Sequence, residues 1–147
     1  MKRKITLIET VDFFGIDEID GERIENRYII GYFFDEKKIE EALCYYKEYK
    51  KESEEIVISE FDFKCSKYQK YVYVLFYEYS LIVDGEFQDF YEHFEPLSSY
   101  KKCLKTKNEL LKNTKYQIDS KKIFDDSKDG FHIEKIKINF FLRFSHR

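Results

Sequence analysis

Two stretches of this chain run through the same order of hydrophobic patterns, and this order constrains the fold more than any other feature of the sequence. In each stretch, two strand-like segments, alternating or apolar on both faces, precede a segment whose apolar residues recur three and four positions apart, and a further strand-like segment follows. A period of 2 is typical of strands and a period of 3.6 of helices. The chain is therefore predicted to contain two tandem units of the order strand, strand, helix, strand.

The first unit is predicted over residues 1–66. Its expected elements are strands at residues 4–11, 27–34 and 55–63 and a helix that ends near Lys51. The polar stretch between the first two strands, with Gly15 and Gly21, is expected to be a long hairpin loop. Asp35 stands where the N-cap of the helix belongs. The apolar face of this helix is expected to carry Ile39, Ala42, Leu43, Tyr46 and Tyr49.

The second unit is predicted over residues 67–147. Its expected elements are strands at residues 71–83, 87–94 and 136–144 and a helix capped by Ser98 or Ser99. Asp84 and Gly85 form a tight hairpin signal between the first two of these strands. The inner stripe of the helix is expected to carry Tyr100, Cys103, Leu104, Lys107 and Leu111.

The connections within each unit predict its topology. A right-handed crossover from the second strand to the third makes these two strands parallel, and the first strand then lies between them. We expect an α+β fold in which each unit is a three-stranded sheet of order 2-1-3 with one helix on one face. The two units are expected to form one compact body.

The most strand-like segment, residues 71–83, has tyrosines on one face. Tyr71, Tyr73, Tyr77 and Tyr79 stand at odd positions, and alternate residues of a strand project from the same face. The opposite face is fully apolar and is the expected seat of the second helix; it carries Val72, Val74 and Phe76. The tyrosine face is then either covered by the sheet of the first unit or open to a partner.

Two segments resemble a known family. Residues 28–43 and 129–139 are similar to short bacterial and phage proteins that are classified only as a domain of unknown function. The matching residues are Gly31, Phe33, Asp35 and Ala42 in the first segment and Gly130, Phe131, Ile133, Ile136, Ile138 and Asn139 in the second. Each motif is clear in only one unit, so the resemblance spans most of the chain when both halves are combined. It implies a strand–strand–helix–strand fold and provides no catalytic residues.

The composition is that of a globular protein. Hydrophobic residues make up 43% and charged residues 37%, and a chain of 147 residues can bury a core without a metal or a disulfide. The N-terminus lacks the apolar run of a signal peptide, and nowhere is an apolar stretch long enough to span a bilayer. The cysteines, Cys44, Cys65 and Cys103, form no C-x-x-C pair, which favours reduced thiols in the cytoplasm.

The sequence contains no catalytic motif for nucleotide binding, metalloprotease or serine-hydrolase chemistry. Asp125, Ser127 and Asp129 have the spacing of half a calcium loop, but Ile136 stands where the bidentate glutamate is needed. The histidines lie in separate segments without ligand spacing, at His93, His132 and His146. Cys103 lies on the inner stripe of the helix and is expected to be a core residue. We expect no enzymatic activity, no metal and no cofactor.

Charge is unevenly distributed along the chain. Residues 1–66 carry 11 basic and 17 acidic side chains, a net charge of −6, whereas residues 67–147 carry a net charge of +3. The excess of lysine is greatest in and after the second helix, and the candidate nucleic-acid contacts are Lys101, Lys102, Lys105, Lys112 and Lys115. Against this reading, the whole chain is acidic, with an isoelectric point of about 5.7.

The aromatic content favours a protein-binding function. Phe and Tyr make up 19% of the residues, and protein interfaces are enriched in aromatic side chains. We therefore expect a non-enzymatic module that binds another protein through Tyr71, Tyr73, Tyr77 and Tyr79. The phage members of the similar family suggest an accessory protein that inhibits a host defence enzyme or a toxin. The alternative is a single-stranded nucleic-acid-binding protein that uses the lysine-rich helix and the tyrosine-rich strand.

Overall fold

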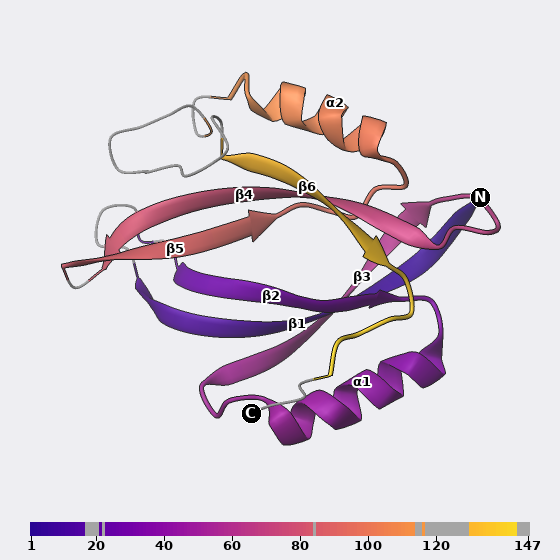
Figure 1. Ribbon diagram of the computed structural model, residues 1–147, viewed down its shortest axis with the longest axis horizontal. Helices are drawn as coiled ribbons and strands as arrows, with labels where there is room; N and C mark the ends of the chain where they lie inside the picture. Colours follow the sequence, from indigo (N-terminus) through magenta and orange to yellow (C-terminus); the bar gives the residue numbers. More distant parts are fainter. Residues whose placement is uncertain (17–20, 22, 84, 114–115, 117–129, 144–147) are drawn as a thin grey trace. The chain divides into compact units, whose positions relative to one another are not determined.

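The computed structural model describes residues 1–16, 21, 23–83, 85–113, 116 and 130–143. Within these residues the chain is an α+β protein with two three-stranded sheets and two helices (Figure 1). The elements are β1 (Lys2–Ile16), β2 (Arg23–Phe33), α1 (Glu36–Tyr49), β3 (Glu54–Lys64), β4 (Tyr71–Val83), β5 (Glu86–His93), α2 (Tyr100–Leu110) and β6 (Phe131–Lys137). In the described residues, neither helix is long and apolar enough to span a membrane.

The two sheets have the same strand order. The first is ordered β2-β1-β3 and the second β5-β4-β6, so the predicted α+β class and the 2-1-3 order are confirmed. Strand β1 is antiparallel to both of its neighbours, so β2 and β3 point the same way, as the crossover rule requires. In the second sheet, β4 pairs with β5 in antiparallel register from Phe76 opposite His93 to Val83 opposite Glu86.

The chain divides into two compact units, but not at residue 66. Met1–Tyr71 and the segment from Ile136 onward form the first unit, and Val72–Lys135 forms the second. The C-terminal segment returns to the first unit because its backbone pairs there. The amide of Ile138 donates to the Lys70 carbonyl at 2.9 Å, and the amide of Asn139 donates to the Tyr32 carbonyl at 2.8 Å.

Helix α1 packs its apolar face on the first sheet. Asp35 is the N-cap, as predicted, and its carboxylate accepts from the amide of Lys37 at 2.9 Å. The core cluster consists of Ile8, Ile30, Phe33, Ala42, Tyr46 and Phe141, with Ile39, Leu43, Tyr45 and Ile56 packed against it. The expected face is therefore correct except at its end, where Tyr49 is exposed and its ring lies 4.7 Å from that of Tyr45.

The predicted strand over residues 136–144 is wrong in extent. Strand β6 ends at Lys137, and Asn139 has a left-handed backbone with φ of 61°. A residue in this conformation breaks the alternation of a strand. Phe141 is consequently buried, whereas its neighbours Phe140 and Leu142 are exposed. Phe144 lies outside the described residues.

The predicted hairpin loop after residue 11 is shorter than expected. Strand β1 continues to Ile16 and β2 begins at Arg23, with irregular register between Phe13 and Gly15. Polar residues can continue a strand where the backbone of the partner strand is close enough to pair, and here Asp12 lies opposite Asn26. The hairpin therefore extends beyond the part that the hydrophobic alternation marks.

Helix α2 packs on the opposite face of β4 from the one expected. The core of the second unit consists of Leu75, Tyr77, Tyr116 and Phe131, with Tyr79, Phe94, Leu110, Leu111 and Ile133 packed against it. Leu110, at the end of α2, thus meets the tyrosine face, and the prediction that Val72, Val74 and Phe76 form the helix seat is wrong. Tyrosine rings bury a large apolar area when they pack in a core, so a face rich in tyrosine need not be a surface.

The stripe that α2 buries also differs from the expected one. Cys103 is fully buried, and the half-buried residues around it are Thr106, Lys107 and Leu110. Tyr100 and Leu104 are 54% and 37% exposed, so their assignment to the inner stripe is wrong. Both stripes have helical spacing, and the apolar residues of so short a helix do not distinguish them.

Candidate binding surfaces

The tyrosines of β4 do not form an exposed strip. Tyr77 is 0% exposed, and its ring lies 4.7 Å from that of Phe131 and 5.0 Å from that of Tyr116. Tyr71, Tyr73 and Tyr79 are half-buried. The structure therefore places the centre of the predicted partner site in the core of the second unit.

Of the titratable residues suggested by the sequence, the structure describes His93 and His132 but neither His146 nor the partial calcium loop. His93 and His132 lie on either side of Phe76, and His132 stacks on it with ring centroids 5.0 Å apart. Among the described residues, no group of three or more His, Cys, Asp or Glu side chains is arranged to hold a metal ion. His146, Lys115 and the partial calcium loop of Asp125, Ser127 and Asp129 lie outside the described residues.

The cysteines are free thiols with different exposure. Cys44 is exposed, and Cys65 and Cys103 are buried. Burial raises the pKa of the Cys103 thiol to about 11, so this side chain stays protonated near neutral pH. Since the thiolate is the nucleophilic form, Cys103 is a core residue rather than a reactive one.

A buried carboxylate lies on the sheet of the first unit. Glu9 is almost fully buried, and the Arg27 guanidinium lies 3.3 Å from it while also contacting Glu25 at 3.0 Å. Burial, and secondarily the charge of Glu9, raise the pKa of the Tyr32 hydroxyl far above its ordinary value. The cation compensates a charge that the fold buries, and a structural role explains this group.

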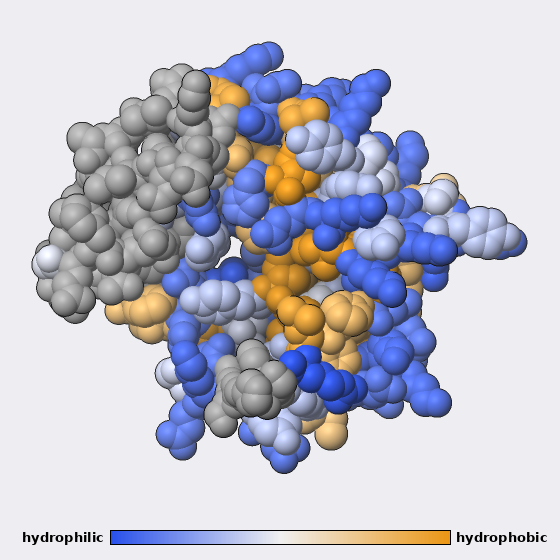
Figure 2. Space-filling view, viewed as in Figure 1, coloured by the Kyte–Doolittle hydropathy of each residue, from blue (hydrophilic) through white to orange (hydrophobic). Residues whose placement is uncertain are grey.

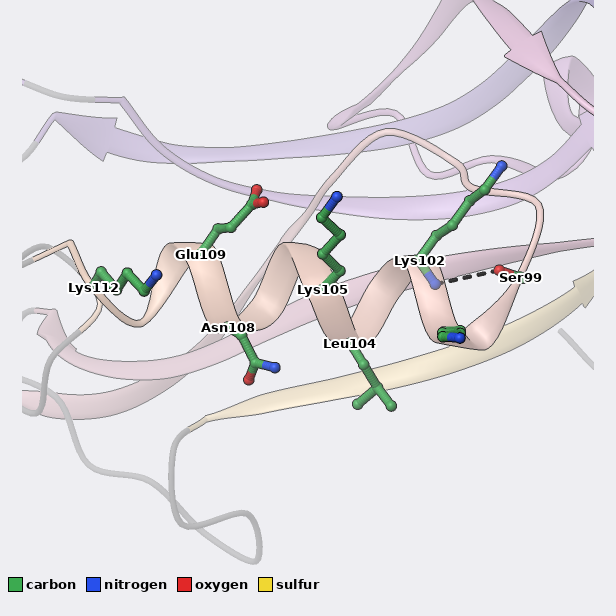
Figure 3. A pocket seen from close by; sticks show the side chains of 8 residues that line it. Ser99, Lys102, Leu104, Lys105, Asn108, Glu109 and Lys112 are labelled. Atoms are coloured by element: carbon green, nitrogen blue, oxygen red, sulfur yellow. Dashed lines mark hydrogen bonds between the residues drawn. The ribbon is translucent and has the colours of Figure 1, made fainter.

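The outer face of α2 is hollowed and basic. A cavity of about 680 Å³ follows the helix, and its described lining comes from Ser99, Lys101, Lys102, Leu104, Lys105, Asn108, Glu109 and Lys112. Figure 3 shows Lys102, Lys105 and Glu109 on one side of the helix and Leu104 and Asn108 on the other. Ser99 is the N-cap, one of the two predicted candidates, and accepts from the amide of Lys102 at 3.2 Å. The described lining thus contains four lysines and one acidic side chain.

The surface over α2 is mostly hydrophilic, with a few hydrophobic residues between the charged ones (Figure 2). Leu104, which is 37% exposed, lines the cavity together with the lysines. Four of the five lysines predicted from the sequence therefore line one cavity, whereas Tyr100 is exposed at the start of the helix and is not part of this lining.

The far end of the β1–β2 hairpin carries exposed apolar side chains that the sequence analysis missed. Phe13, Phe14 and Ile16 are 50%, 45% and 63% exposed, and we call these three residues the apolar ribbon end. Strand β3 begins at Glu54, opposite Asp12, so β1 pairs only with β2 beyond that point. The signal was present as the run FFGI within a polar stretch, but the stretch was interpreted as a loop.

No family profile, curated protein or solved structure matches this chain. The resemblance at residues 28–43 and 129–139 accordingly stays a prediction. Any functional assignment must be argued from the surfaces of the chain itself.

Proposed function

We propose that this chain is a non-enzymatic module that binds another protein, and that the apolar ribbon end is the centre of the contact. The observation that supports this most directly is the exposure of Phe13, Phe14 and Ile16 within four consecutive residues. A cluster of exposed large apolar side chains on a soluble domain marks an interaction surface more often than isolated ones do. Tyr28, on β2, is also exposed and can extend the contact.

The position of the apolar ribbon end argues against a role in the core. A two-stranded ribbon contributes little stability by itself, and half-exposed rings at its end bury only part of their surface. The same rings in an interface would be fully desolvated, and aromatic anchors of this kind supply most of the binding free energy of protein complexes.

The charge around the apolar ribbon end defines the partner. Phe13 lies opposite Glu25, and its neighbour Asp12 lies opposite Asn26. The surrounding sequence, residues 1–66, carries a net charge of −6. We therefore propose a partner surface with an apolar centre and a basic rim, since complementary charge steers encounter and fixes orientation.

Binding alone suffices for several kinds of biological action. An inhibitor of a defence enzyme or an immunity protein that neutralises a toxin needs a contact surface and no reactive group. We propose a function of this kind, on the analogy with phage proteins drawn from the sequence.

We also propose that the chain consists of two tandem ββαβ units derived from one ancestor. The shared element order and the shared 2-1-3 sheet order support this. The return of the C-terminal segment to the first unit is then a later difference between the copies.

The binding proposal is tested by co-purification from the native host, identification of the partner by mass spectrometry, and affinity measurement with the purified partner. The double variant Phe13→Ser/Ile16→Ser should weaken binding by about 30-fold or more, because loss of one hot spot typically costs about 2 kcal/mol. A K37Q/K47Q variant on α1 serves as a control for surface substitution, and Tyr73→Ala measures whether the half-buried tyrosines contribute. Unchanged affinity in the folded Phe13→Ser/Ile16→Ser variant would refute the assignment of this surface.

A further inference from the structure

We infer that the outer face of α2 is a second binding surface, which takes single-stranded nucleic acid through its phosphates and bases. This inference uses other residues than the proposed protein contact and does not depend on it. It concerns Lys101 and Lys105 of α2 and Lys112 just beyond its end, together with Tyr100 and Leu104.

The lysines form a row. Successive helical residues are about 100° apart, which places Lys101 and Lys105 within about 40° of each other around the axis and about 6 Å apart along it. Lys112 follows directly after the C-cap of the helix, Leu111. All three residues are exposed and line the same cavity.

The charges of this row are not neutralised within the described part of the chain. None of these lysines forms an ion pair with a described residue, and the Nζ of the neighbouring Lys102 donates to the Ser98 hydroxyl at 2.8 Å. Glu109 is the only acidic side chain in the described lining of the cavity. A local field of this kind favours an anionic ligand although the whole chain has a net charge of −3.

The placement of these charges opposes the stability of the helix. The first turn of α2 contains Lys101 and Lys102 and no acidic residue, whereas the first turn of α1 contains Glu36. The positive end of the helix dipole favours acidic side chains there, and the like-charged pair Lys101–Lys105 at i,i+4 is also unfavourable. The first turn of α1 also contains two lysines, Lys37 and Lys38, but Glu36 offsets them. An anionic ligand would offset Lys101 and Lys102 in the same way.

An exposed aromatic side chain precedes Lys101 at the start of the helix. Tyr100 is 54% exposed, and Leu104 lies one turn further along the same side of the helix. Single strands bind where a basic groove that follows the phosphates lies beside aromatic rings on which bases stack. An acidic protein would also use the lysines, and the test therefore compares the single strand with a polyglutamate peptide.

The test measures binding of fluorescein-labelled dT15 by anisotropy at several salt concentrations. The three lysines predict a slope of about −2 in log K against log salt, that is, about 15-fold weaker binding at 200 mM than at 50 mM salt. The variant K101Q/K105Q should bind at least about 10-fold more weakly with a slope near −0.7, and Tyr100→Ala should lose about 10-fold with an unchanged slope. The K37Q/K47Q variant should bind like the wild type.

A stability measurement separates binding from folding. In K101Q/K105Q the urea midpoint should stay the same or rise, because the substitutions remove charges that the helix dipole disfavours. Binding that falls while stability holds supports the inference. Absence of dT15 binding at 50 mM salt would overturn it. So would equal binding of a polyglutamate peptide with no effect of Tyr100→Ala, which would instead indicate an acidic protein ligand.

Discussion

Asn139 joins the end of the chain to the start of helix α1. Its side-chain oxygen accepts from the amides of Phe34 at 2.8 Å and Asp35 at 3.0 Å, while its own amide donates to Tyr32. Its φ of 61° is a conformation that asparagine tolerates better than most residues. One side chain more than 100 positions away thus satisfies amides that precede the helix.

Substitution of Asn139 should therefore destabilise the first unit. Asn139→Ala removes two hydrogen bonds and leaves alanine in a left-handed backbone, which together should lower the free energy of unfolding by about 2–4 kcal/mol. Asn139→Asp keeps the acceptor oxygen and should lower the free energy of unfolding much less. Urea unfolding followed by circular dichroism measures both, and equal losses in the two variants would contradict this role of the oxygen.

Gly31 allows a close approach of two backbones. A Cβ at this position would lie 2.6 Å from the carbonyl oxygen of Phe140 and 2.8 Å from the ring of Phe33. The carbonyl belongs to the segment that follows β6, so this segment can lie along β2 only if residue 31 has no side chain.

Gly31→Ala should consequently cost about 3 kcal/mol of stability, because a backbone atom cannot move aside as a flexible side chain can. Gly85→Ala is a suitable comparison. Its Cβ would meet nothing within 4 Å, and only its φ of +83° opposes the substitution, so the expected cost is about 1–2 kcal/mol. A thermal or urea midpoint for Gly31→Ala as high as that for Gly85→Ala would show that the segment can shift.

At the scale of elements, α2 illustrates how a short helix can be placed by its neighbours. Tyr100 and Leu104 form one apolar stripe and Cys103 and Leu110 another, and the structure buries the second. This stripe is buried because it packs against β4, where Leu75 and Tyr77 form a continuous apolar surface.

Tyr77 is the residue of β4 on which this packing depends most. Tyr77→Ala should lower the free energy of unfolding by about 3–5 kcal/mol, as truncation of a fully buried aromatic side chain does. Because Tyr73 is only half-buried, Tyr73→Ala should lower it clearly less. Tyr77→Phe is the control that keeps the ring. If the Tyr77→Ala and Tyr73→Ala variants unfold at the same urea concentration, the burial of Tyr77 contributes no more to stability than that of Tyr73, contrary to our expectation.

At the scale of the whole molecule, the C-terminal segment crosses from one unit to the other. After β6 it runs beside α1 (Figure 1), where Phe141 joins the core and the Tyr46 hydroxyl donates to the Leu142 carbonyl at 2.8 Å. The Arg143 guanidinium lies over the rings of Phe141 and Tyr45. The first unit therefore combines Met1–Tyr71 with the described residues that follow β6.

Truncation after Lys137 tests this dependence. It removes Asn139, Phe141 and the Tyr46 hydrogen bond, so amide hydrogen exchange in α1 should become faster while exchange in α2 changes little. Phe141→Ala in the full chain should have the same effect with smaller magnitude. Equal loss of protection in α2 would mean that the two units unfold as one.

The types and order of the elements, and the caps at Asp35 and Ser99, could be predicted from the sequence because they depend on local periodicity and on groups within one helical turn. The same reasoning assigns Lys101, Lys102 and Lys105 to one helix. Local periodicity does not predict contacts between residues that are far apart in the sequence. The stripe buried by α2, the end of β6 and the position of Phe141 are decided by packing against residues far away in the chain, as in the hydrogen bonds of Asn139 with Phe34 and Asp35. Exposure of Tyr100 and of the apolar ribbon end follows from that packing, since the neighbouring elements decide how much of a side chain solvent can reach.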